Sequence, residues 1–220
     1  MNVNRLFFIV LLFAPAFANG ADIGSVDAAQ ARLEIIAAIQ NLIEVVSFTL
    51  GLLLMVAGGY KLKINADQNG KIGFGVAGVY VLVGAAMINM KESISTFTNT
   101  YFKVDFCKMI GDDGGISNSC FKDEISGLTG PIKERIAKLS SDTAAQKFID
   151  NIETIVGIFQ VIGFIYFLVG LYGMTQVAKG SANHGYGKPL ITMVASALIV
   201  DIPHTATTFV DTLNKIGITF

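Results

Sequence analysis

Residues 41–60 carry the sequence NLIEVVSFTLGLLLMVAGGY, in which Glu44 is the single charged residue. A helix of about 20 apolar residues is long enough to cross the roughly 30 Å hydrocarbon core of a bilayer. Three further apolar stretches follow at 72–90, 151–174 and 189–202, and the last can extend to Val210. The sequence therefore predicts an all-α membrane protein with four transmembrane helices, arranged as tandem hairpins at 41–90 and 151–210.

The composition of the whole chain supports this class. Hydrophobic residues make up 52% of the 220 residues and charged residues only 15%, whereas soluble domains carry about 25% charged residues. Mean hydropathy is +0.58. The formal net charge of −1 lacks the basic excess that binds a phosphate backbone. We therefore expect membrane lipid as a partner and no specifically bound nucleic acid.

The N-terminus has the pattern of a secretory signal peptide at 1–18. Arg5 precedes an apolar run at 6–13, and Ala16-Phe17-Ala18 is a small-x-small cleavage site. We expect a mature chain that starts at Asn19; an uncleaved first anchor is the alternative. Residues 19–40 are rich in alanine with scattered charges, which favours a short periplasmic helix.

Lysines in the two short polar loops set the orientation, because positively charged loops remain in the cytoplasm. The N-terminus, the central region 91–150 and the tail 211–220 are then periplasmic, and the protein is expected in a bacterial inner membrane. The lysines assigned to these cytoplasmic turns are Lys61, Lys63, Lys71, Lys179 and Lys188.

The chain has two cysteines, Cys107 and Cys120, and both fall in the expected periplasmic region. An oxidising compartment favours a disulfide between them, and closing a loop of this length contributes about 3 kcal/mol in the chain-entropy model. Two unrelated buried thiols are the alternative. Without further ligands nearby, the pair cannot complete a zinc site.

An internal repeat relates the two hairpins at an offset of 112 residues without gaps. Eleven identical pairs fall between 43–100 and 155–212, including Thr96-Phe97 on Thr208-Phe209. Both copies enter the membrane from the same side, so we expect a pseudo-two-fold axis along the membrane normal. Paired glycines are predicted to let helices approach closely: Gly51, Gly58, Gly163 and Gly170.

Asp201 falls near the outer edge of the last span, and its repeat mate Asn89 is expected at the same depth. An ionisable group at such a position is a functional hypothesis by default. Three interpretations remain open for Asp201: an interfacial carboxylate that caps a short helix before Pro203, a polar contact between subunits, or an ion-coupling site. The sequence leaves open whether the last span ends at Pro203 or bends and continues.

No constellation of catalytic residues is found on one side of the membrane. Gly73-x-Gly75-x-x-Gly78 matches a dinucleotide fingerprint literally, but it lacks the strand and the acidic residue of a nucleotide site. His184 and His204 fall on opposite sides in the expected topology. We therefore predict a non-enzymatic protein with no cofactor, no metal and no identified small-molecule substrate.

Two stretches resemble small inner-membrane subunits of type IV secretion and conjugation systems. The first runs from Gly187-Lys188-Pro189-Leu190 to Ile202-Pro203, and the weaker copy covers 75–89. The resemblance is to the DotE/IcmC, DotV and DotP/IcmD group of the Dot/Icm type IVB system, and to the TraQ and TraR proteins of conjugative plasmids. It covers about a quarter of the chain, and those short members are not expected to have a cysteine-bearing region between their hairpins.

This resemblance implies an accessory subunit of a translocation complex, related to a channel or a pilus, with other subunits as partners in an oligomer or hetero-complex. Two other hypotheses stay open. One is a small ion-coupled transporter or channel that uses Asp201 and Asn89. The other is an envelope protein that anchors partners through residues 91–150.

Overall fold

The computed structural model describes residues 28–67, 74–103, 106, 108 and 142–217. Within these ranges the chain is helical and has no strand, which confirms the expected all-helical class. Two helices are long and apolar enough to cross a membrane, and the number rises to four if each of two bent helix pairs is one span.

The first hairpin consists of α2 (Ala28–Asp67) and α3 (Phe74–Ile88). The sequence predicted a separate helix within 19–40 followed by a span at 41–60, but α2 is one continuous helix of 40 residues. Residues 28–67 contain no proline, so nothing removes a backbone hydrogen bond where the two expected elements meet. At about 1.5 Å per residue, α2 is roughly twice as long as the hydrocarbon core is thick.

The second hairpin consists of α7 (Asp142–Ala178) and α8 (Gly187–Val200). The helix α7 begins inside the expected periplasmic region 91–150 and ends where Gly180 adopts a φ of 69°, a conformation that glycine enters without steric cost. Pro189 lies in the first turn of α8, where the missing backbone N–H has no partner in any helix.

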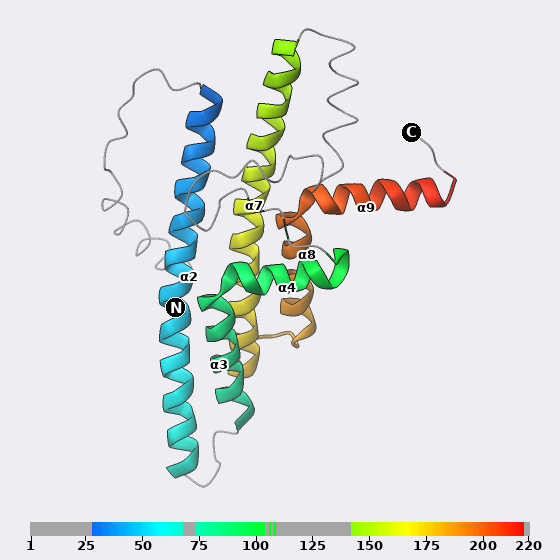
Figure 1. Cartoon of the computed structure of the whole chain (residues 1–220). Helices are drawn as coiled ribbons and strands as arrows, with labels where there is room; N and C mark the ends of the chain where they lie inside the picture. The colour runs from blue at the N-terminus through cyan, green and yellow to red at the C-terminus, as the bar shows by residue number, and fades with distance from the viewer. Residues whose placement is uncertain (1–27, 68–73, 104–105, 107, 109–141, 218–220) are drawn as a thin grey trace.

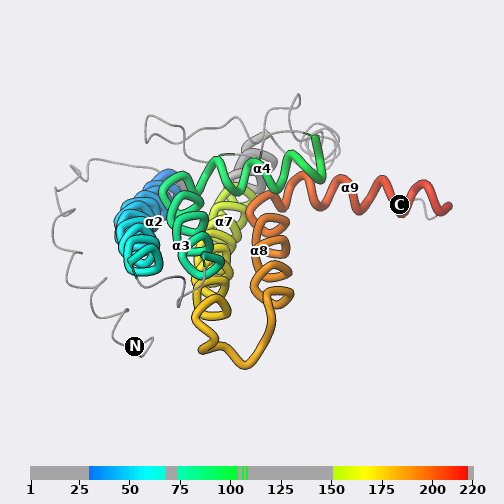
Figure 2. Tube along the Cα trace, turned by 90° about the horizontal axis from the view of Figure 1, so that it is seen from below, coloured from blue at the N-terminus to red at the C-terminus, as the bar shows by residue number. Residues whose placement is uncertain are grey.

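Each short helix bends into another helix at nearly a right angle. The helix α4 (Met90–Phe102) follows α3 at 94°, and α9 (Ile202–Lys215) follows α8 at 91°. The sequence had assigned the residues of α4 to the central region and the end of α9 to the tail. Figure 2 shows α4 running across the bundle of α2, α3, α7 and α8, whereas α9 projects outward from the end of α8.

The two hairpins pack side by side along α2, α3 and α7, with a shift along the bundle. The buried Gln40 amide of α2 donates to the Gln160 side-chain oxygen of α7 at 3.4 Å. In Figure 1, α7 extends beyond α2 at one end of the bundle and α2 extends beyond α7 at the other.

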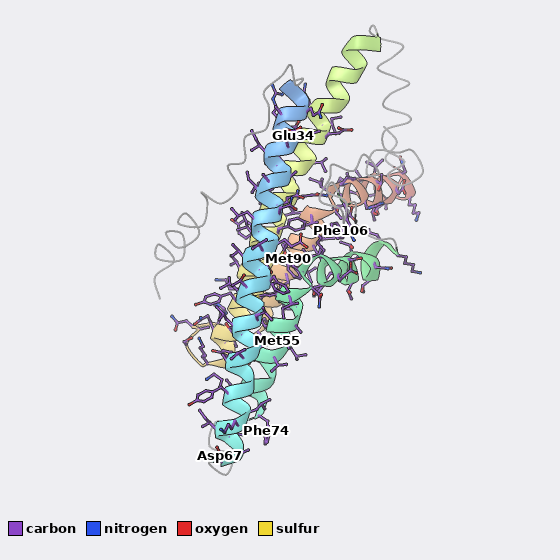
Figure 3. The ribbon with its side chains drawn as sticks, turned by 60° about the vertical axis from the view of Figure 1, so that its left-hand side comes forward. Glu34, Met55, Asp67, Phe74, Met90 and Phe106 are labelled. Atoms are coloured by element: carbon purple, nitrogen blue, oxygen red, sulfur yellow. The ribbon has the colours of Figure 1, made fainter. Side chains whose placement is uncertain are left out.

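The hydrophobic core is formed by buried residues of α3, α4, α7 and α8, together with Phe106. The Phe97 ring of α4 meets the Phe167 ring of α7 edge-on, with centroids 5.7 Å apart. Phe106 makes a similar edge-on contact with Phe164. Figure 3 shows Met90 where α4 begins beside α2, and Asp67 and Phe74 at the far end of the first hairpin.

Candidate functional site at the two helix breaks

The bends at Asn89 and Asp201 share one backbone geometry. Asn89, between α3 and α4, has φ −111° and ψ 55°. Asp201, which lies 112 residues later between α8 and α9, has φ −105° and ψ 51°. The bend at Asp201 precedes Pro203, which cannot continue a helix interior. The bend at Asn89 forms without a proline, because Lys91 occupies the corresponding position.

At the first break, a serine hydroxyl donates a hydrogen bond to a backbone carbonyl that has lost its helical N–H donor at the bend. A continuous helix would pair the Ala86 carbonyl with the backbone N–H of Met90. The bend displaces that donor, and the Ser93 hydroxyl donates to the Ala86 carbonyl at 3.1 Å. The Ser93 backbone N–H donates to the Asn89 carbonyl at 2.9 Å, which starts the ladder of α4.

The second break repeats these bonds with a threonine. The Thr205 hydroxyl donates to the Leu198 carbonyl at 2.8 Å, and the Thr205 backbone N–H donates to the Asp201 carbonyl at 3.0 Å. The role of Ser93 and Thr205 was not predicted from the sequence. The sequence did contain a signal for it: a serine or threonine lies four positions after both Asn89 and Asp201, and these two hydroxyl residues match each other at the offset of 112.

Asp201 is fully buried and forms a close pair with His204, which is nearly buried. The imidazole Nδ1 lies 2.7 Å and 2.9 Å from the two carboxylate oxygens. Although Asp201 occupies the N-cap position of α9, its side chain makes no capping hydrogen bond to the backbone. Pro203 contributes to this outcome because it has no N–H at the second position of the helix.

The helix α4 links the first break to the second. It begins directly after Asn89 and ends at Phe102, whose ring lies 6.1 Å from the His204 ring between centroids. The imidazole of His204 is therefore held between the Asp201 carboxylate of its own hairpin and an aromatic ring of the other. The sequence placed these residues in different regions and predicted no contact between them.

The two break residues differ in their surroundings. Asn89 is exposed, whereas Asp201 is buried, and no hydrogen bond between the two is found in the described ranges. Near Asn89, the Lys91 ammonium group forms a salt bridge of 2.8 Å with Glu44 of α2. An ion site that needs Asn89 and Asp201 together therefore has no geometric support in the residues the structure describes.

The four glycines named from the sequence lie at the two contacts within hairpins. A Cβ atom on Gly51 would come within 2.7 Å of the Gly84 carbonyl oxygen of α3, and one on Gly58 within 2.8 Å of Val81. In the second hairpin, a Cβ on Gly163 would come within 2.5 Å of Val200, and one on Gly170 within 2.6 Å of Met193. Both hairpins therefore rely on glycine for a close helix–helix approach.

The remaining residues named from the sequence are dispersed. Lys63, Lys179 and Lys188 are exposed and Lys61 is half-buried. Lys61 and Lys179 both approach the ring of Tyr80. Lys71, Cys107 and Cys120, together with the expected signal peptide, lie outside the described residues.

In the described ranges, the second break brings together one carboxylate and one imidazole, those of Asp201 and His204. In the part of the chain that the structure describes, no group of three His, Cys, Asp or Glu side chains could hold a metal ion. No protein family, curated protein or solved structure matches this chain.

Proposed function

We propose that this chain is a non-enzymatic inner-membrane subunit of a type IV secretion or conjugation apparatus, in which it supports the assembly of a channel or pilus-related structure. The observation that carries the proposal is the pair of matching right-angle bends at Asn89 and Asp201. These bends turn α4 across the bundle and α9 away from it (Figure 2), and two helices lying along the membrane surface in this way would present a platform to other subunits.

A duplicated hairpin accounts for the two bends. The helices α8 and α9 end 112 and 113 residues after α3 and α4, close to the offset found in the sequence. The backbone angles of the break residues agree within a few degrees, and both breaks use a hydroxyl bond that spans seven residues. Two unrelated bends have no reason to share all three features.

The relation between the hairpins includes a shift. The repeat register matches Gln40 with Ile152, but Gln40 contacts Gln160, eight residues further along α7. At 1.5 Å per residue this corresponds to about 12 Å along the helix axis. The simple two-fold axis expected from the sequence would put Gln40 level with Ile152, so we propose a rotation combined with a translation.

The proposed orientation places the breaks near the periplasmic side and the ends of α2 and α7 at the cytoplasmic side. The Glu44–Lys91 salt bridge lies near the breaks, and Lys61 and Lys179 lie near the other end of the apolar segments. Positively charged residues mark the cytoplasmic side of membrane proteins. A cleaved signal peptide at 1–18 and a disulfide between Cys107 and Cys120 belong to the same proposal.

Deletion of the coding sequence in the source bacterium tests this function. We expect loss of protein secretion or conjugative transfer, restoration by the wild-type chain, and co-purification of a tagged chain with the secretion ATPase complex from solubilised membranes. Transfer at the wild-type level in the deletion strain would refute the proposal.

A small ion-coupled transporter is the second candidate, and the burial of the Asp201–His204 pair is the observation that favours it. Ionisable pairs buried in membrane proteins often lie on ion or proton pathways. Proteoliposomes that contain the purified chain would show a proton or cation flux that Asp201→Asn abolishes. An equal flux in the wild type, the variant and empty liposomes would eliminate this candidate.

A further inference from the structure

Two lysines from different hairpins approach one aromatic ring. The Lys61 ammonium group, on α2, lies 5.2 Å from the ring centroid of Tyr80 in α3. The Lys179 ammonium group, directly after α7, lies 5.4 Å from the same centroid. Each distance is within the range of a cation–π interaction. The shift between the hairpins brings the end of α7 level with Lys61 and so creates this arrangement.

The hydroxyl group of Tyr80 is buried and has no hydrogen-bond partner among the residues that the structure describes, and the whole side chain is only 3% exposed. Buried tyrosine hydroxyl groups usually find a partner, because an unsatisfied buried donor is costly. The orphaned hydroxyl belongs to the same ring that both ammonium groups approach. In the described part of the chain, Tyr80 thus combines a hydroxyl group that has no acceptor with a ring that two ammonium groups approach.

No carboxylate neutralises the two lysines in the described part of the chain, where neither Lys61 nor Lys179 takes part in a salt bridge. Two ammonium groups near one ring repel each other, and an anion that contacts both would offset this repulsion. A phosphate group has several acceptor oxygens, enough to pair with both ammonium groups and with the Tyr80 hydroxyl.

We propose that Lys61, Tyr80 and Lys179 form a binding site for a phosphate group at the lysine-bearing end of the bundle. The apolar segments of α2 and α7 stop near these lysines, so the site lies at the height of lipid headgroups if these helices span the bilayer. Basic pockets between membrane helices bind anionic headgroups in this way. The source of the phosphate is either an anionic lipid or a soluble phosphate ion.

Binding to the purified full-length chain in a neutral detergent tests the site. Phosphatidylglycerol, phosphatidylcholine and inorganic phosphate are added separately, and bound molecules and thermal unfolding are followed by native mass spectrometry and fluorescence. We expect phosphatidylglycerol to bind and to stabilise the wild type. Lys61→Gln and Lys179→Gln should each weaken this binding about fivefold, whereas a response to inorganic phosphate as well would identify a site for the free ion.

The matched control is the pair Lys63→Gln and Lys188→Gln, which removes the same charge from exposed lysines that do not contact Tyr80. We expect these variants to bind as the wild type does. Equal weakening in both pairs would show a general charge effect and overturn the site, as would equal binding of phosphatidylglycerol and phosphatidylcholine or no binding of any probe.

Tyr80→Phe separates a ligand role from a packing role. Without the orphaned hydroxyl, the variant should unfold at a higher temperature than the wild type in neutral detergent, and phosphatidylglycerol should stabilise it less. If phosphatidylglycerol raised the unfolding temperature of Tyr80→Phe as much as that of the wild type, the hydroxyl group would not bind the phosphate. These outcomes concern the site alone, and secretion by the deletion strain tests the proposed function separately.

Discussion

Asn89 and Asp201 stand 112 residues apart in the chain and adopt the same backbone conformation, with φ near −110° and ψ near 50° in both. Each residue ends a short apolar helix and begins a more polar helix at a right angle to it. The side chains differ and only the second break precedes a proline, but both breaks have a hydroxyl group four residues later that donates to a carbonyl before the bend. The first prediction addresses that hydroxyl group.

Ser93→Ala and Thr205→Val should each destabilise the protein by about 1–2 kcal/mol, since each leaves a carbonyl group at a break without its donor. Thermal unfolding in detergent measures the loss. The controls are Thr100→Val and Thr212→Val, whose exposed hydroxyl groups bond only to their own helix. If the control variants lose as much stability, the loss in Ser93→Ala and Thr205→Val does not come from the unpaired carbonyl groups at the two breaks.

Gly51→Ala and Gly163→Ala should each lower stability by about 1–3 kcal/mol, the usual cost of overpacking a tight contact. Their Cβ atoms would clash with the facing helix of the same hairpin. Gly59→Ala and Gly78→Ala place a Cβ in open space and should stabilise their helices by about 0.5–1 kcal/mol. Equal effects on unfolding temperature in the two sets would contradict the close approach.

His204→Phe should cost about 1–3 kcal/mol because it removes an imidazole donor from the buried Asp201 carboxylate. The substitution keeps an aromatic ring beside Phe102, so the loss reports the polar contact. In the background of Asp201→Asn the same change should cost less, and a double-mutant cycle of unfolding free energies gives the coupling. A coupling of zero would mean that the two side chains do not stabilise one another.

The shift between the hairpins predicts which cysteine pairs cross-link. In a background of Cys107→Ser and Cys120→Ser, Gln40→Cys with Gln160→Cys should form a disulfide, because these side chains meet in the structure. Gln40→Cys with Ile152→Cys should not, since about 12 Å of helix separates the levels of the two positions. Mass spectrometry of proteolytic fragments identifies the bond, and the reverse pattern would indicate a simple two-fold arrangement.

Reporter fusions test the orientation. Alkaline phosphatase, which is active only in the periplasm, should be inactive when fused at Asn183 in the turn between α7 and α8, and active when fused after Phe220. A fluorescent protein that folds only in the cytoplasm should give the opposite pattern. Activity of the phosphatase at both positions would mean that the chain does not cross the membrane between Asn183 and Phe220.

The sequence by itself determined the helical class, the positions of the apolar segments and the spacing of the glycines. These properties are local: the length of an apolar run and the identity of a residue decide them without reference to the rest of the chain. The offset of 112 residues also pointed to Asn89 and Asp201 as a pair. It could not show that both positions are sharp bends between two helices, because a change from apolar to polar residues is equally compatible with a helix that simply ends there.

The tertiary structure alone decided which distant side chains meet. The contact of Phe102 with His204 depends on a right-angle turn at Asn89, and the approach of Lys61 and Lys179 to Tyr80 depends on the shift between the hairpins. A bend angle and a shift arise from the packing of whole helices against one another. No window of sequence contains that information, because each contact joins residues from separate helices.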